Sequence, residues 1–221
     1  MYNSLWRPIA DGRMKTGAML AETDLEKLFA VSRTVIRPVL EHMAIEGCLV
    51  IPPHKSARVI EPTPDEAEAI FDVLGVVMRH IIGELADPAR EITAGQRRMI
   101  ELHLEAQGQA DKAGDPIAAH LLGVEFLVLL AAIHGRVLFT DLIARTIVLE
   151  TLSLKLYGEF PPPVFYVEFQ SSLARAILAG KPQEALAEFD ARLARIRGTL
   201  KFDTPAQYEE GDLTVLLGTK R

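Results

Sequence analysis

The chain has 221 residues, of which 49% are hydrophobic, with a formal net charge of −6 and a single cysteine. This length suits two small domains, and one cysteine excludes an intrachain disulfide framework. The acidic average does not exclude a nucleic-acid partner, since residues 1–62 carry eight Lys/Arg against seven Asp/Glu, and the remainder sixteen against twenty-three.

The sequence gives no sign of export or membrane insertion. Its first residues lack the basic and then apolar pattern of a signal peptide. The most apolar run, 121–133, contains Glu125 and is too short to cross a bilayer. We therefore expect a cytoplasmic protein with no membrane partner, in which Cys48 is a small buried residue.

Residues 20–29 are predicted to form a short amphipathic helix. Leu25, Leu28 and Phe29 follow helical spacing, and Thr23 or Asp24 can start the helix. Only about three residues separate its end from Ser32, a turn length typical of helix-turn-helix motifs.

A second helix is predicted to begin after Ser32, whose side chain can accept a hydrogen bond from the backbone amide of residue 34 or 35. Ile36, Leu40 and Met43 then form one apolar stripe. We expect that stripe to be buried.

The opposite side of this helix carries the candidate DNA-reading residues. Arg33, Thr34 and Arg37 project from its first turns, and two arginines near the N-terminus of a half-buried helix are typical of a DNA recognition helix. Arginine can bind O6 and N7 of guanine through two hydrogen bonds, worth about 1–3 kcal/mol of discrimination. For this segment alone, the alternative is an ordinary amphipathic surface helix.

Residues 48–51 and 57–60 read as two short β-strands around a loop with a basic tip, which predicts a β-hairpin. Helix, turn, helix and hairpin in this order indicate a winged helix-turn-helix over residues 1–62. Hydroxyls and cations mostly hold phosphates and set the register on DNA. We assign that positioning role to Ser32, Thr34, Lys55 and Arg58, and the base-reading role to Arg33 and Arg37.

Several separated residue types resemble the N-terminal domain of GntR-family bacterial transcription regulators over residues 5–62. They are Gly12, Gly17, Leu20, Glu22 and Leu25, then Val31-Ser32-Arg33-Thr34, then Glu46-Gly47-x-Leu49-Val50. The resemblance implies that Arg33 and Arg37 contact operator bases. It also implies that Ser32 and Thr34 contact phosphates or base edges, and that the wing tip reaches the minor groove.

Three departures from the family pattern concern the same surface. Pro38 stands where the family usually has glutamate, Thr23 replaces a first-helix arginine, and His54 occupies the place of a wing glycine. A proline inside a helix removes an amide donor and costs about 3 kcal/mol, so the helix is either kinked there or regular only from Pro38 onwards. These departures keep an alternative open, in which the winged domain no longer reads an operator and the chain is a small-molecule or protein binding module.

The run Glu61-Pro62-Thr63-Pro64 predicts a domain boundary, followed by an all-α, antiparallel six-helix bundle over residues 63–210 and a tail over 211–221. The fold class is therefore mainly α, a winged head followed by a bundle. The expected helices are 65–86, 93–112, 116–133, 136–159, 163–179 and 182–208.

A six-helix bundle after such a head resembles the FCD effector domain of the FadR subfamily, in its shorter VanR-like branch. Many members of that subfamily hold a divalent metal through one aspartate and three histidines. The corresponding positions here are Gly123, Leu127, Gln170 and Arg192, none of which is a good metal ligand. We therefore expect no metal cofactor at that position.

The same region is the predicted effector site for an apolar carboxylate, which Arg192 would pair with. Its lining is predicted to comprise Leu74, Met78, Gly123, Val124, Leu127, Gln170 and Leu173. The alternative is a solid core with Arg192 reaching solvent. A replacement metal site is a weaker alternative, drawn from His80, Glu84, His103, His120 and His134.

No arrangement of nucleophile, base and acid suggests an enzyme. Together these patterns predict a ligand-responsive transcriptional regulator, with repression the favoured direction. It would bind a palindromic operator in double-stranded DNA as a homodimer.

Overall fold

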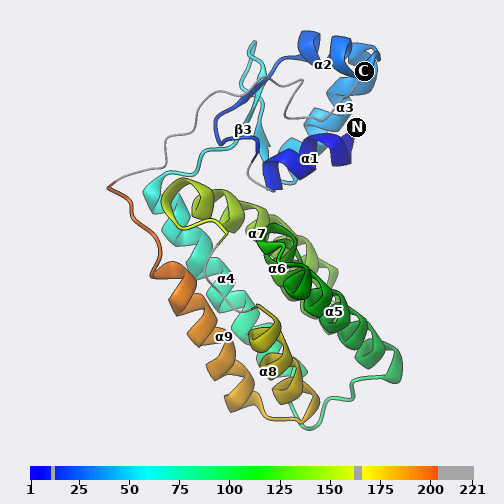
Figure 1. Ribbon diagram of the computed structural model, residues 1–221, viewed down its shortest axis with the longest axis vertical. Coiled ribbons are helices and arrows are strands. Elements are labelled where there is room, and N and C mark those ends of the chain that lie inside the picture. The colour runs from blue at the N-terminus through cyan, green and yellow to red at the C-terminus, as the bar shows by residue number, and fades with distance from the viewer. Residues whose placement is uncertain (11–12, 162–165, 204–221) are drawn as a thin grey trace.

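The computed structural model describes residues 1–10, 13–161 and 166–203, and shows a winged head at one end of an elongated helical bundle (Figure 1). The head contains α1 (Tyr2–Ala10), β1 (Met19–Leu20), α2 (Glu22–Phe29), α3 (Arg33–Ile45), β2 (Leu49–Val50) and β3 (Ala57–Val59). The three strands form one antiparallel sheet in the order β1-β3-β2. The predicted helix-turn-helix and hairpin are confirmed.

The apolar stripe of α3 is buried as predicted, with Ile36, Leu40 and Met43 in the core of the head. Pro38 lies on the exposed side within one continuous helix that begins at Arg33. The interpretation that helical structure starts only near Pro38 was therefore wrong.

The two predicted helix starts differ in detail from the structure. Ser32 is the N-cap of α3, but its side chain makes no capping hydrogen bond and lies 2.6 Å from the hydroxyl of Thr34 instead. α2 begins at Glu22, before Thr23, and has Ala21 as its N-cap. Leu20 belongs to β1, where Met19 is exposed and Leu20 is buried, rather than to the start of that helix.

The six predicted bundle helices are all present. They are α4 (Pro64–Leu85), α5 (Ala94–Ala113), α6 (Pro116–His134), α7 (Val137–Tyr157), α8 (Tyr166–Leu178) and α9 (Pro182–Arg197). Thr63 starts α4 with a capping box, exchanging hydrogen bonds with Glu66. α9 ends at Arg197, so its predicted extension towards residue 208 was too long. The predicted tail and the predicted start at Pro163 lie outside the described residues.

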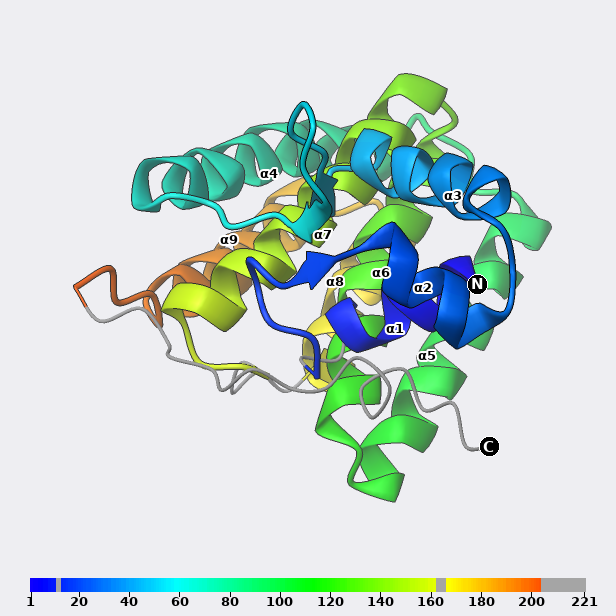
Figure 2. The ribbon, with the colours of Figure 1, turned by 90° about the horizontal axis from the view of Figure 1, so that it is seen from above.

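Two hydrophobic cores organise the molecule. One fills the bundle around α6, and the other fills the head between α2, α3 and the sheet. Leu152 of α7 is buried in the head core, although the flanking Ile147 and Leu154 belong to the bundle core. Seen from above, the head elements lie over one end of the bundle, where α1 contacts α7 (Figure 2).

α6 is long and apolar enough, by length and composition, to span a membrane, in contrast to the shorter run considered from sequence. Half of its most apolar window is buried inside the protein. Phe126, Leu127 and Leu130 are fully buried there, as expected for the central helix of a bundle.

The turn of the helix-turn-helix contains a non-glycine residue in the left-handed region, Ala30 at φ 51°. In this conformation the Cβ atom lies too close to the backbone, a strain that glycine does not have. Ala30→Gly should therefore raise the free energy of unfolding by about 1 kcal/mol. Ala44→Gly, inside α3, should instead lower it by about 0.5–1 kcal/mol. Equilibrium unfolding in denaturant measures both, and a loss of stability in Ala30→Gly would contradict the assigned turn.

Candidate nucleic-acid interface

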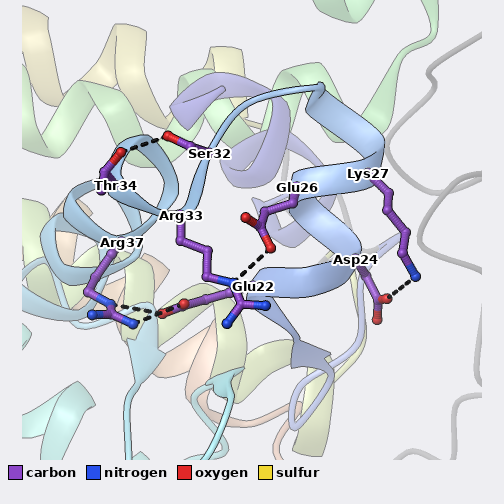
Figure 3. Close-up of polar contacts among 8 residues, drawn as sticks. All are labelled: Glu22, Asp24, Glu26, Lys27, Ser32, Arg33, Thr34 and Arg37. Atoms are coloured by element: carbon purple, nitrogen blue, oxygen red, sulfur yellow. Dashed lines mark hydrogen bonds and ion pairs between the residues drawn. The ribbon is translucent and has the colours of Figure 1, made fainter.

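The candidate reading arginines are exposed on α3 but are held by carboxylates of α2. Arg37 donates from Nε and a terminal nitrogen to both carboxylate oxygens of Glu22, at 3.0 and 3.1 Å. Arg33 donates from Nε to Glu26 at 2.8 Å. Figure 3 shows both guanidinium groups turned towards the first helix of the motif.

These pairs connect equivalent positions on the two helices. Glu22 and Glu26 are four residues apart on α2, and Arg37 and Arg33 are four residues apart on α3, so one helical turn separates the members of each set. The pairing of these glutamates with the arginines was not predicted from the sequence. The matched spacing was the signal that could have revealed it.

The pairs orient the arginines without removing them from solvent. The side chains of Arg33 and Arg37 remain 54% and 61% exposed. The hydrogen bonds from Arg37 hold the pKa of the Glu22 carboxyl below its usual range, so the pair is charged near neutrality. Exposed ion pairs contribute little net energy, so a phosphate or base edge can exchange with either glutamate.

The remaining DNA-binding candidates are also exposed. Thr34 lies beside Ser32 at the N-terminus of α3 (Figure 3). Lys55 lies in the wing loop and Arg58 on β3. His54 adopts φ 59°, the left-handed conformation expected of the glycine that it replaces.

In the bundle, the space beside Gly123 is filled by Tyr166 of another helix. A Cβ atom built on Gly123 would lie 2.1 Å from the Tyr166 ring, closer than any real contact. Leu127, Leu74 and Met78 are fully buried in the same core. The positions aligned with the family's first two metal ligands therefore lie in tightly packed surroundings.

Arg192 is buried and faces a carboxylate of its own chain. Its terminal nitrogen lies 3.7 Å from Glu150 on α7, and both side chains are at most 1% exposed. Among the residues that the structure describes, neither the nitrogens of Arg192 nor the oxygens of Glu150 have a hydrogen-bond partner. Burial raises the pKa of Glu150, an effect that Arg192 opposes. Glu150 could not be identified from sequence, because its pairing depends on how α7 and α9 are both packed against α4.

The other polar groups of the interior are joined to one another. Gln170 donates to Gln107 and to the Leu122 carbonyl, each at 3.2 Å. His120 Nδ1 lies 2.8 Å from the hydroxyl of Tyr166. Most of the polar side chains around the predicted effector position thus already have partners within the chain.

Three of the five residues considered from the sequence for a replacement metal site come together near the C-terminal end of α4. The ligand atoms of His80, Glu84 and His134 lie within 4.8 Å of one another, and His134 Nε2 is 2.7 Å from Glu84. His103 and His120 lie elsewhere, against Leu122 and Tyr166 respectively.

Known proteins resemble this chain in the sequence of the head and in the overall fold. Residues 1–59 match the sequence profile of the family described as bacterial regulatory proteins, gntR family. The solved structure of E. coli McbR/YncC is 16% identical and covers 89% of this chain and 93% of its own, with a TM-score of 0.72. A protein from Rhodococcus sp. RHA1, described as a GntR transcriptional regulator, is 18% identical. It covers 90% of this chain and 97% of its own, with a TM-score of 0.75.

No curated protein matches the chain in sequence. At identities this low, the two structures establish a shared fold, a winged head followed by a helical bundle. The family profile defines the head itself. Residues 1–59 are thus similar to the N-terminal domain of the bacterial regulatory proteins of the gntR family.

The packing of Tyr166 against Gly123 predicts a large effect from one methyl group. Gly123→Ala should lower the free energy of unfolding by about 1–3 kcal/mol, because the ring must shift within a filled core. Gly108→Ala is the matched control, since Gly108 is also inside a helix and a Cβ atom there would meet nothing within 4 Å. Gly108→Ala should raise the free energy of unfolding by about 0.5–1 kcal/mol. Thermal or denaturant unfolding measures both variants. Equal changes in their free energies of unfolding would contradict the packing of Tyr166 against Gly123.

The buried imidazole predicts a pH-dependent stability. Burial, together with the charges of Arg192 and Lys155, lowers the pKa of His120 to about 3. Between that value and about 6.5 the unfolded chain therefore binds one proton more than the native chain, so stability falls as pH falls through this window. At pH 5 the loss should be about 2 kcal/mol. His120→Gln should flatten the slope of unfolding free energy against pH. An unchanged slope in His120→Gln would contradict the assignment.

Proposed function

We propose that this protein is a ligand-responsive transcriptional regulator, favoured as a repressor, that binds a palindromic operator as a homodimer. The observation that carries the proposal is the pair of exposed arginines on α3, in a head that matches the GntR family over residues 1–59. Bidentate contacts from Arg37 and Arg33 to guanine would supply sequence preference. Ser32, Thr34, Lys55 and Arg58 would contact phosphates and set the register.

A homodimer is the arrangement that fits a palindrome, since two heads would meet half-sites about one DNA turn apart. The exposed apolar residues at the start of α7 support pairing through the bundle: Val137 and Leu138 are 73% and 75% exposed. Six helices after the head also support assignment to the FadR subfamily with a VanR-like FCD domain. The boundary near residues 62 and 63 is part of that proposal, as is a cytoplasmic location.

The effector is proposed to be a small apolar acid. In the predicted interior position, lined by Leu74, Met78, Gly123, Leu127 and Gln170, a carboxylate that pairs with Arg192 would have to replace Glu150. The proposal includes no metal at this position. The residues that align with the family's four metal ligands, Gly123, Leu127, Gln170 and Arg192, are not good metal ligands.

Two substitutions separate base reading from phosphate binding. Arg37→Ala should lose about 1–3 kcal/mol of preference for a selected operator over a scrambled duplex. Arg37→Lys keeps the positive charge beside Glu22 but cannot form the two-bond fork, so it should lose most of the same preference. Fluorescence anisotropy with both duplexes measures the ratio of the two affinities.

Lys55→Ala should weaken binding to both duplexes about equally and reduce the slope of log K against log salt by about one. Arg98→Ala, an exposed arginine on α5, is the control that should leave binding unchanged. If Arg37 and Lys55 variants are both silent, α3 is not the reading helix and the alternative of a binding module without operator recognition is favoured.

A further inference from the structure

A cleft of about 990 Å³ lies between the head and the bundle. One wall comes from α1, Arg13 and Glu46, and the other from α6 and α7. Figure 1 shows α1 on the side of the head that faces these two helices. The volume is at the upper end of the range of small-molecule sites, which are roughly 300–1,000 Å³.

The cleft combines apolar walls with guanidinium groups. Trp6 lies on the head side, and Val124, Val128 and Val148 lie on the bundle side. Arg7 and Arg145 are exposed at the cleft, and neither has a hydrogen bond or ion pair with any residue in the described ranges. The Arg145 side chain reaches towards the head, since a Cβ atom on Gly47 would lie 3.8 Å from its Nε.

The two carboxylates at the cleft do not cancel this positive charge. Glu46 accepts a hydrogen bond from the Tyr2 hydroxyl and forms an ion pair with His42 at 3.3 Å. Glu125 is the other acid, against three arginines in all. An anion with an apolar body therefore matches the walls and the charge together, whereas a cation does not.

The position of the cleft connects it to the reading helix. Glu46 is the C-cap of α3, and its contact with Tyr2 joins that helix end to α1. α7 forms part of the opposite wall and also places Leu152 in the head core. A molecule between these walls would bind differently as the angle of the head changes, which is the condition for a ligand to shift an equilibrium.

We propose that this cleft is an effector site for a small apolar monoanion, such as an aromatic carboxylate or sulfonate. Its charged group is held by Arg145 and Arg7, and its apolar body lies between Trp6 and the valines of α6 and α7. The bound anion fixes the head relative to the bundle and thereby changes operator affinity. This coupling rests on the proposed DNA-binding function, but the binding site itself does not.

Trp6 is the only tryptophan in the chain, so its fluorescence reports directly on the cleft. The probe is 1-anilinonaphthalene-8-sulfonate, an apolar aromatic monoanion, titrated into the full-length protein without DNA. We expect saturable binding of one probe per chain with quenching of Trp6. Arg145→Gln should weaken probe binding roughly five- to tenfold, which corresponds to about 1–1.4 kcal/mol of binding free energy. Ala144→Phe should weaken it by narrowing the cleft.

Two further variants locate the probe, and circular dichroism verifies that each is folded. Arg98→Gln, remote on α5, should bind as the parent does. Arg192→Gln distinguishes the cleft from the interior position proposed above: a probe bound at the cleft is retained, whereas a probe bound beside Arg192 is lost. Unchanged affinity in both Arg145→Gln and Ala144→Phe, or loss confined to Arg192→Gln, would overturn the cleft as the site.

The coupling is measured separately, as operator affinity with and without saturating probe. We expect at least a threefold change, which Arg145→Gln abolishes at the same probe concentration. Probe binding with no change in operator affinity would overturn the coupling. Absence of DNA binding under every condition would instead refute the proposed function, while the fluorescence titration would still decide whether the cleft binds an anion.

Discussion

The burial of Leu152 in the head core is the contact on which the arrangement of the molecule depends. α7 otherwise packs in the bundle, with Ile143, Ile147 and Leu154 in that core. One rigid helix therefore belongs to two hydrophobic cores. Burial of a leucine side chain is worth about 1.5–3 kcal/mol, so a movement of the head that exposed Leu152 would carry a cost of that order. The bundle consequently restricts the head more than a simple linker at residues 61–63 would.

The candidate DNA-reading surface of α3 also depends on buried residues. They fix the position of the helix backbone, and the exposed side chains carry the charges. Ile36, Leu40 and Met43 anchor α3, leaving Arg33 and Arg37 on the open face. Glu22 and Glu26 then hold the guanidinium groups in defined directions before any partner arrives. Such pairing reduces the rotamer freedom lost on binding, and it also reduces the net positive charge of the surface. If the proposed function holds, a head built this way favours selective contacts over strong nonspecific attraction to phosphates.

Much of the fold could be predicted from the sequence because it is encoded in local periodicity. The spacing of Leu25, Leu28 and Phe29 and of Ile36, Leu40 and Met43 predicted both helices of the motif, and the long apolar segments predicted the six bundle helices. Short elements were not predicted. β1 has only two residues, and it forms because β3 pairs with it. α1 was also missed, as its packing against the rest of the head is not visible in local spacing. The predicted capping hydrogen bond of Ser32 does not form, because its hydroxyl pairs with the hydroxyl of Thr34 instead.

The candidate sites were less predictable, because they depend on contacts between distant segments. Sequence alone identified Arg192 as a candidate partner for an effector carboxylate but did not identify Glu150, which lies opposite it on another helix. It identified Gly123 as unable to bind metal but not Tyr166 as the group that fills the space. The roles of the DNA-binding and effector residues remain predictions, which the variants above are designed to test.

The central claim is that the winged head reads DNA. The most direct test is selection of binding sites from a random double-stranded pool by the full-length protein, followed by titration of the selected site at two salt concentrations. We predict enrichment of a palindrome with half-sites about one DNA turn apart, and affinity that falls steeply with salt. No enrichment, or binding that is insensitive to salt, would contradict it.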